Sequence, residues 1–111
     1  MDTSFHGEVA LVTGGSSGIG RVTALAFAAQ GARVVVASRR SAESSETVRL
    51  IQAAGGDAMF VRTDVSKAAD VEALVAQTIQ RYGALNFAFN NAGIEGDSFV
   101  PLAKYSEATW D

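Results

Sequence analysis

The stretch from Ala10 to Gly20 constrains the fold more than any other part of this 111-residue sequence. An apolar run ends at Thr13, and glycines follow at positions 14, 15, 18 and 20 with two serines among them. Apolar residues then recur at spacings of three and four, which is typical of one face of a helix. That face consists of Ile19, Val22, Ala26 and Ala29. The sequence therefore predicts a strand, a tight glycine turn and a helix, in that order.

The predicted turn has the features of a phosphate-binding site. The first amides of a helix have no acceptor within the helix and lie at the positive end of its dipole, where an anion is stabilised. Glycines let the backbone come close to a pyrophosphate because they carry no Cβ. The spacing Gly14-x-x-x-Gly18-x-Gly20 is neither the general dinucleotide fingerprint nor a P-loop. An ordinary glycine-rich turn is the alternative, but the strand before it and the helix after it favour a nucleotide phosphate.

Strand and helix patterns alternate along the rest of the chain. We expect strands over residues 8–13, 33–37, 58–62 and 85–89, a first helix over 18–30, and two further helices with Ser41 and Ser66 as N-caps. The third helix has the clearest apolar stripe, formed by Val71, Leu74, Val75, Thr78, Ile79 and Tyr82. Because parallel strands need helical crossovers, this order predicts an α/β fold with a doubly wound parallel sheet of four strands in the order 3-2-1-4.

In a sheet of that order, a ligand should bind where the order reverses, at the carboxyl ends of the first and fourth strands. The glycine turn lies at the end of the first strand. A second turn, Asn90-Asn91-Ala92-Gly93, lies at the end of the fourth strand. The two turns are placed independently, and their agreement supports a ligand site at this end of the sheet.

The end of the second strand bears on which dinucleotide would bind. Dinucleotide folds that select NAD place an acid about 20 residues after the glycines. This chain has Ser38, Arg39 and Arg40 there, and its next acid is Glu43. A carboxylate would repel the 2′-phosphate of NADP, whereas a guanidinium can bind it with two parallel hydrogen bonds. We therefore predict NADP as the cofactor, with NAD less favoured; the alternative is two exposed arginines in a surface loop.

Asp64 and Val65 close the third strand, beside the place of the adenine in such a fold. Asp64 could accept a hydrogen bond from the adenine amino group, and Val65 could line the ring. The alternative is a turn aspartate before the cap Ser66, and residue chemistry alone favours this alternative because aspartate is common in turns.

Composition argues against several other functions. The 9 basic and 12 acidic residues give a net charge of −3 and are spread along the chain, without the basic patch of a nucleic-acid-binding protein. There is no cysteine for a disulfide or a thiolate metal site, which is compatible with a cytoplasmic location. No apolar run approaches the roughly 18 residues of a membrane span. We expect residues 1–7, with the one histidine His6, to be a tail without the character of a secretory signal, and residues 8–111 to form one domain.

Three motifs together resemble one known family. Thr13-Gly14-x-x-x-Gly18-x-Gly20, Asp64-Val65 and Asn90-Asn91-Ala92-Gly93, in this order and spacing, are similar to the short-chain dehydrogenase/reductase family, of which the chain would cover the N-terminal half. The resemblance implies a Rossmann-type domain that binds NAD(P) and a homo-oligomer. It also implies hydride transfer between nicotinamide and a small-molecule alcohol or carbonyl substrate.

The resemblance implies roles for individual residues as well. The pyrophosphate would be surrounded by Gly14, Ser16, Ser17, Gly18, Ile19 and Gly20. Ser38 and Arg39 would meet the adenosine ribose or its phosphate, as in the NADP-preferring members. Asp64 and Val65 would meet the adenine, which reverses the preference for a turn aspartate. Asn91, Ala92 and Gly93 would pass beside the cofactor, and Asn90 or Asn91 would also tie the central strands together.

Two departures from the family pattern are visible. The family often has an acid just before the fourth strand, where this chain has Asn86. Its catalysis uses a serine and a Tyr-x-x-x-Lys unit; these 111 residues contain no Tyr-x-x-x-Lys, and we assign no catalytic residue. The readings left open are an NADP-dependent oxidoreductase whose catalytic half is absent from this chain, an inactive NADP-binding module, and an unstable truncated product. A fourth strand at the sheet edge would expose Leu85, Phe87 and Phe89, so we expect the isolated chain to self-associate or to be unstable.

Overall fold

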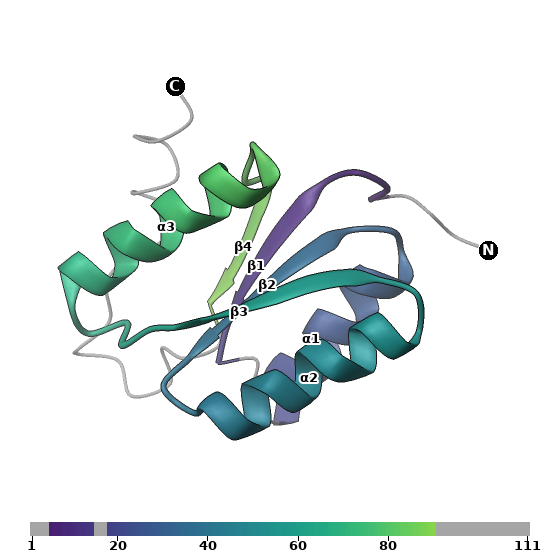
Figure 1. Ribbon diagram of the computed structural model, residues 1–111, viewed down its shortest axis with the longest axis horizontal. Coiled ribbons are helices and arrows are strands. Elements are labelled where there is room, and N and C mark those ends of the chain that lie inside the picture. The colour runs from purple at the N-terminus through teal and green to yellow at the C-terminus, as the bar shows by residue number, and fades with distance from the viewer. Residues whose placement is uncertain (1–4, 15–17, 91–111) are drawn as a thin grey trace.

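The structure, a computed structural model, describes residues 5–14 and 18–90 (Figure 1). Within these residues, four strands alternate with three helices, as the sequence predicts. The strands are β1 (Val9–Thr13), β2 (Arg33–Ser38), β3 (Asp57–Arg62) and β4 (Phe87–Asn90). The helices are α1 (Gly18–Ala29), α2 (Ser41–Ala53) and α3 (Ala68–Tyr82).

All four strands are parallel and lie in the order β3-β2-β1-β4, which confirms the predicted doubly wound sheet. All five residues of β1 are buried, because this strand has a neighbour on each side and helices over both faces. In the register of the sheet, Thr13 at the end of β1 pairs with Ala37 of β2 and with Asn90 of β4. The carboxyl ends of these three strands are therefore level with one another.

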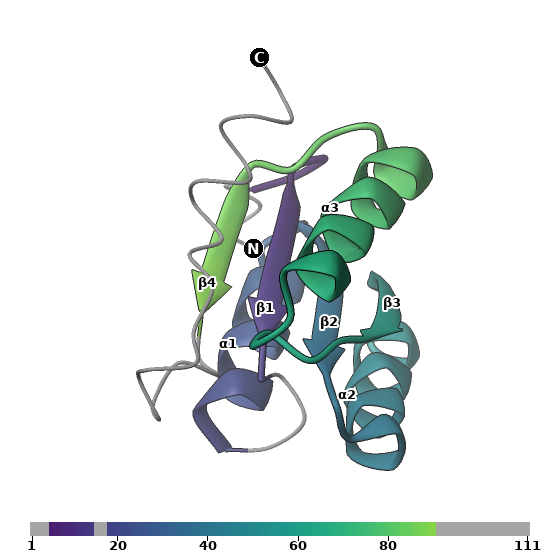
Figure 2. The ribbon, with the colours of Figure 1, turned by 90° about the vertical axis from the view of Figure 1, so that its left-hand side faces the viewer.

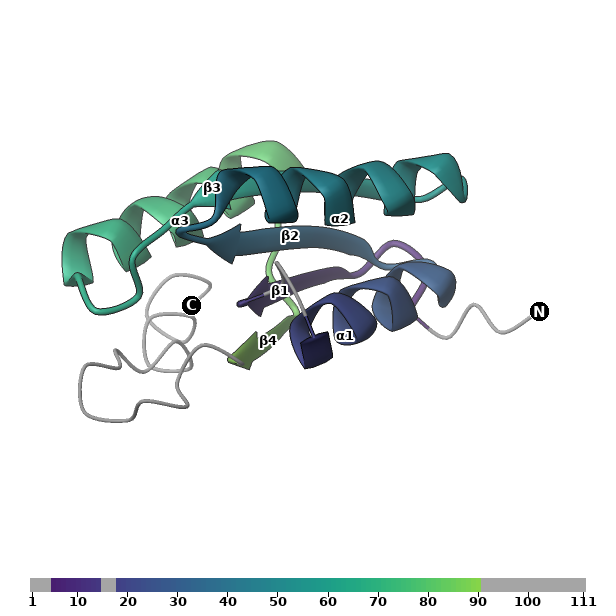
Figure 3. The same ribbon diagram turned by 90° about the horizontal axis from the view of Figure 1, so that it is seen from below.

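Helices cover the two faces of the sheet as separate layers (Figure 2). α3 packs on one face, in a cluster that includes Leu11 of β1. α1 and α2 lie beside each other on the opposite face, in a cluster that includes the next residue, Val12 (Figure 3). Successive side chains of a strand point to opposite faces, so the continuous apolar run of β1 serves both clusters. The predicted stripe of α3 is confirmed at Val71, Leu74, Val75 and Thr78, which are buried.

The buried face of α1 differs from the predicted one. The predicted face, Ile19, Val22, Ala26 and Ala29, is exposed. Ile19 and Val22 are each 66% exposed, and the helix buries Gly20 and Ala24 instead. Small residues let α1 lie close to the strands. Because apolar residues occur all round this helix, its periodicity does not distinguish one face from the other.

The predicted N-caps Ser41 and Ser66 do not cap the helices. Ser41 is the first residue of α2, and Arg40 before it makes no side-chain cap. α3 has Lys67 at its N-cap position, also without a side-chain cap. Ser66 instead donates its amide and its hydroxyl to Oδ1 of Asp64, at 3.0 and 2.6 Å. The carboxylate two residues earlier satisfies this serine locally, which explains the difference.

β4 begins two residues later than predicted, at Phe87. Leu85, expected at an exposed edge, is fully buried in the cluster under α3. Phe87 is half-buried, with the ring centroids of Phe5 and Phe27 at 5.0 and 5.7 Å from its own. Phe5, within the segment expected as a tail, thus contacts the folded part of the chain. Phe89 remains 39% exposed, so the edge presents less apolar surface than the sequence suggests.

Asn86 joins β1 to the segment before β4. Its Oδ1 accepts a hydrogen bond from the amide of Val9 at 2.8 Å, and its own amide donates to the Val9 carbonyl at 2.9 Å. The asparagine therefore supplies the acceptor oxygen that a carboxylate would supply at the same position.

We expect Asn86→Ala to lower the free energy of unfolding by about 1–2 kcal/mol, because the part-buried amide of Val9 loses its acceptor. Asn86→Asp should stay close to the parent, since a carboxylate oxygen can accept the same bond. Equilibrium unfolding in urea measures all three proteins. An equal loss in both variants would contradict the role assigned to the side-chain oxygen.

The exposed ring of Phe89 is expected to promote self-association of the isolated chain at the β4 edge. Phe89→Lys should shift the chain toward the monomer, because a charged side chain on an edge strand opposes pairing. Val22→Lys changes a residue of α1 that is 66% exposed and leaves the edge intact, so it should associate like the parent. Light scattering after size-exclusion chromatography measures the masses, and a parent that is monomeric at all concentrations would overturn this prediction.

Candidate functional site

The carboxyl ends of the strands form the candidate site (Figure 2). The sheet order reverses between β1 and β4, and open α/β sheets bind ligands at such a switch point. The glycine turn follows β1, Ser38 ends β2, Asp64 follows β3, and Asn90 ends β4. The fold thus brings residues from four separate segments of the chain to one end of the sheet.

The glycines of the turn have a conformational reason to be glycines. Gly14 has a φ of 71° and Gly18 a φ of 56°, in the left-handed region that other residues rarely adopt. The amide of Gly14 donates to the Ala37 carbonyl at 2.7 Å, which extends the pairing of β1 and β2 by one residue. Among the described residues, apart from its chain neighbours, no atom lies within 4 Å of the place where a Cβ would stand on Gly18. Ser16 and Ser17 lie outside the described residues.

The N-terminus of α1 is directed at this end of the sheet. α1 begins at Gly18, immediately after the turn, and Ile19 at its start is 66% exposed. The amides of a first helical turn lack acceptors within the helix and carry the positive end of its dipole. This helix start can receive an anionic group.

Ser38 is buried and its hydroxyl is already bonded within the chain. Ser38 Oγ lies 2.5 Å from the hydroxyl of Ser44 in α2, and it accepts a hydrogen bond from the amide of Arg40 at 3.0 Å. Arg39 and Arg40 are exposed. Arg40 NH1 lies 3.8 Å from Oε2 of Glu43, a loose ion pair in water. The β2 end is therefore a short loop, held by Ser38, that presents two guanidinium groups.

Asp64 forms the local turn that its residue chemistry favours. The hydroxyl and the amide of Ser66 both bond its Oδ1 and hold the pKa of Asp64 below its usual value. The charges of Arg39 and Lys67 lower this pKa in the same direction, which places Asp64 in the electrostatic field of Arg39. Val65 is half-buried and packs against the cluster under α3.

Asn90 ties β4 to β1. The hydroxyl of Thr13 donates to Asn90 Oδ1 at 2.9 Å, as expected for Asn90 or Asn91. Asn90 Nδ2 is buried and has no hydrogen-bond partner in the part of the chain that the structure describes. A buried donor without an acceptor is unfavourable, so this amide suits an acceptor group of a ligand at the same end of the sheet. Asn91, Ala92 and Gly93 lie outside the described residues.

Tyr82 does not belong to the site. It ends α3 and donates to Asp57 Oδ1 at 3.0 Å, at the amino end of β3. Burial, with help from this hydrogen bond, raises the pKa of Tyr82 to about 12. A proton donor for chemistry near neutral pH needs a shift in the opposite direction.

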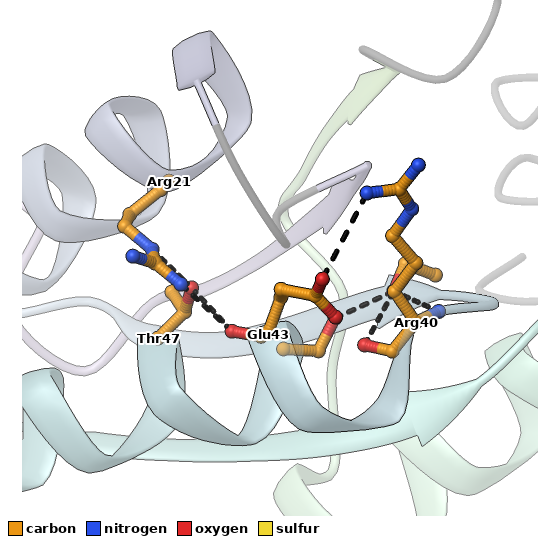
Figure 4. A network of polar contacts seen from close by, with 6 residues as sticks. Arg21, Arg40, Glu43 and Thr47 are labelled. Atoms are coloured by element: carbon orange, nitrogen blue, oxygen red, sulfur yellow. Dashed lines mark hydrogen bonds and ion pairs between the residues drawn. The ribbon is translucent and has the colours of Figure 1, made fainter.

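A polar contact between α1 and α2 borders the site and was not indicated by the sequence patterns (Figure 4). Arg21 Nε donates to Thr47 Oγ1 at 2.8 Å, and Arg21 NH2 donates to the backbone oxygen of Glu43 at 2.9 Å. Thr47 and Ser44 are both fully buried. The signal that could have found them is two hydroxyl residues three apart, on the face of α2 that also carries Ile51.

Residues 5–14 and 18–90 contain neither a metal-binding cluster nor a membrane-spanning helix. No group of three or more histidine, cysteine or acidic side chains in these ranges could hold a metal ion. None of the helices in the same ranges is long and apolar enough to cross a membrane.

Comparison with known proteins identifies the family. The family model of the short chain dehydrogenases matches residues 8–111, and this chain belongs to that family. The match confirms the resemblance carried by the glycine, Asp-Val and Asn-Asn-Ala-Gly motifs. The family consists of oxidoreductases that bind NAD(P) and act on small molecules.

Individual relatives support the same fold. An uncharacterized oxidoreductase of Listeria monocytogenes is 43% identical over 104 residues, which are 94% of this chain and 41% of the relative. A metagenomic short-chain oxidoreductase in complex with NADP is similar with a TM-score of 0.78 at 36% identity, over 82% of this chain and 41% of that one. A short chain dehydrogenase/reductase from Burkholderia phymatum in complex with NAD gives 0.74 at 36% identity, over 79% and 31%. The chain spans about two fifths of the length of the curated relatives it matches.

Thr13→Val should lower the free energy of unfolding by about 1–3 kcal/mol, because it leaves the part-buried Oδ1 of Asn90 without its donor. Thr23→Val makes the same chemical change at a half-buried position of α1 and should cost less than about 0.5 kcal/mol. Urea unfolding measures both variants. Equal stabilities would show that the bond between β1 and β4 contributes little.

Proposed function

We propose that this chain is the NADP-binding part of a short-chain dehydrogenase/reductase that transfers a hydride between nicotinamide and an alcohol or carbonyl substrate. Residues 8–111 would form its NAD(P)-binding domain. The bound nicotinamide supplies or accepts the hydride, and the residues of this chain bind and orient the dinucleotide. A cytoplasmic location and a homo-oligomeric assembly remain predictions.

The glycine turn supports binding of the pyrophosphate. Gly14, after β1, and Gly18, at the start of α1, both have left-handed backbone conformations. None of the described residues other than its chain neighbours comes within 4 Å of a Cβ placed on Gly18, which supports the approach of a phosphate to the first-turn amides of α1. We assign the pyrophosphate to Gly14, Ser16, Ser17, Gly18, Ile19 and Gly20.

The proposal of NADP rather than NAD rests mainly on the residues at the end of β2. Arg39 is exposed directly after the strand, whereas Arg40 has the carboxylate of Glu43 at 3.8 Å. Arg39 is therefore the better candidate to bind a 2′-phosphate, with Arg40 beside it. Ser38 contributes by its small size, since it leaves room for the phosphate where NAD-selecting folds have an acid.

The adenine would lie at Asp64 and Val65. Both bonds from Ser66 use Oδ1 of Asp64, so Oδ2 can accept from an adenine amino group while the turn stays closed. Asn91, Ala92 and Gly93 would pass beside the cofactor after β4. Asn90 Nδ2, the buried donor without a partner, would gain an acceptor from the bound dinucleotide.

The proposed chemistry needs a proton donor that these 111 residues do not supply. The family uses a tyrosine with a lysine four residues later, and this sequence has no such pair. Tyr82, with its raised pKa and its place at the other end of the sheet, does not replace it. We therefore propose that these 111 residues by themselves bind NADP without turnover; an inactive NADP-binding module is the alternative function.

The parent chain should bind NADPH at least about tenfold more tightly than NADH, because one hydrogen bond to a charged phosphate contributes about 1.5 kcal/mol or more. Arg39→Asp should abolish this preference, since a carboxylate repels the 2′-phosphate. Arg49→Asp makes the same charge change on the exposed part of α2 and should retain the preference. Fluorescence titration with the two reduced nucleotides measures the ratio, and an unchanged ratio in Arg39→Asp would remove the proposal for NADP.

A further inference from the structure

Arg21 connects the two helices that border the proposed cofactor site. It is the residue after Gly20, in the first turn of α1. Figure 4 shows its guanidinium reaching toward α2, where it donates to Thr47 Oγ1 and to the backbone oxygen of Glu43. A cation is unfavourable near the positive end of a helix dipole, and the contacts with α2 help to stabilise it there.

Thr47 makes this connection rigid. Its side chain is fully buried, and its hydroxyl accepts from Arg21 while it donates to the Glu43 carbonyl at 3.2 Å. These bonds restrict the direction of the hydroxyl, and the planar fork of the guanidinium holds Thr47 Oγ1 and the Glu43 oxygen at once. The first turn of α2 is thereby held at a set distance from the first turn of α1.

The same turn of α2 is also tied to the end of β2. Ser44, one residue after Glu43, bonds the hydroxyl of Ser38, which in turn accepts from the amide of Arg40. Arg39 lies between these two bonded residues. A continuous series of contacts therefore runs from the helix that follows the glycine turn to the loop that presents the arginines.

We infer that Arg21 is a positioning residue that sets the separation between the pyrophosphate subsite at the start of α1 and the 2′-phosphate subsite at Arg39. The inference rests on the proposed function and deepens it. NADPH occupies both subsites at once, so the second contact is favourable only when the subsites stand at the right distance. NADH lacks the 2′-phosphate and depends less on this distance.

Thr47→Val tests the inference without removing the charge of Arg21. The variant keeps the shape of a buried side chain and removes the hydroxyl that Arg21 contacts. We expect its affinity for NADPH to fall about tenfold and its affinity for NADH to change less than about twofold. Thr47→Ser retains the hydroxyl and should have the same NADPH-to-NADH affinity ratio as the parent chain.

Arg21→Gln is the second variant, with Arg49→Gln as its matched control. Arg49 lies on α2 in an exposed pair with Glu46. Arg49→Gln therefore removes one positive charge at a position outside the proposed site. Arg21→Gln should lower the NADPH-to-NADH ratio as Thr47→Val does, and Arg49→Gln should not. The readouts are fluorescence titrations with NADPH and NADH and thermal unfolding of each variant.

The remaining outcomes are distinct. If the variants lose affinity for NADPH and for NADH by the same factor, Arg21 has a purely structural role and the inference is overturned. A loss in Arg21→Gln together with an unchanged Thr47→Val would show that Arg21 does not act through its bond to Thr47, which also overturns the inference. A parent chain that does not prefer NADPH would overturn both the proposed function and this inference, whereas a parent that prefers it, with variants that keep the same ratio, overturns the inference alone.

Discussion

The position of β1 in the middle of the sheet is the constraint on which the rest of the structure depends. Its five residues are buried on both faces, and each side of the strand is paired with a parallel neighbour. Parallel neighbours can be reached only through crossovers, so the helices must lie on the faces of the sheet. Because Thr13 is level with Ala37 and Asn90, everything that follows β1, β2 and β4 meets at one end. The candidate site is a consequence of this arrangement.

The strand order was predictable because it follows from alternation and from the handedness of crossovers, which need no detail of side chains. The orientation of α1 was not, because a helix rich in alanine has apolar residues on every side. Ile19 and Val22 form the larger apolar stripe and are nevertheless exposed, while Gly20 and Ala24 allow the closer approach to the sheet. Distance of approach, which periodicity does not encode, decided the orientation. Leu85 shows the same limit, since its burial depends on how the chain turns into β4.

The polar contacts of the site were predictable by type and less so by partner. A hydroxyl at Ser38 and a carboxylate at Asp64 were expected near the dinucleotide, and both residues lie at the expected end of the sheet. The partners that occupy them, Ser44 and Ser66, stand six and two residues further along the chain. A motif predicts which residues lie at a site, but it does not predict that a nearby serine bonds the same side-chain oxygen as the ligand would. The hydroxyl of Ser38 is therefore bonded within the chain. In Asp64, Oδ1 is used by the bonds from Ser66 that form the local turn.

The two ends of the proposed cofactor site use different groups of the chain: one uses backbone atoms and the other side chains. For the pyrophosphate end we propose a site made of backbone at Gly14, Gly18 and the first turn of α1. Such a site is fixed as soon as β1 and α1 are in place. The ribose end consists of side chains on the loop between β2 and α2, whose position follows α2. A change of cofactor preference can therefore arise in this loop, or in the contacts of Arg21 and Thr47 that hold α2, while the glycine turn stays the same. This separation is consistent with the similarity of this fold both to a neighbour in complex with NADP and to one in complex with NAD.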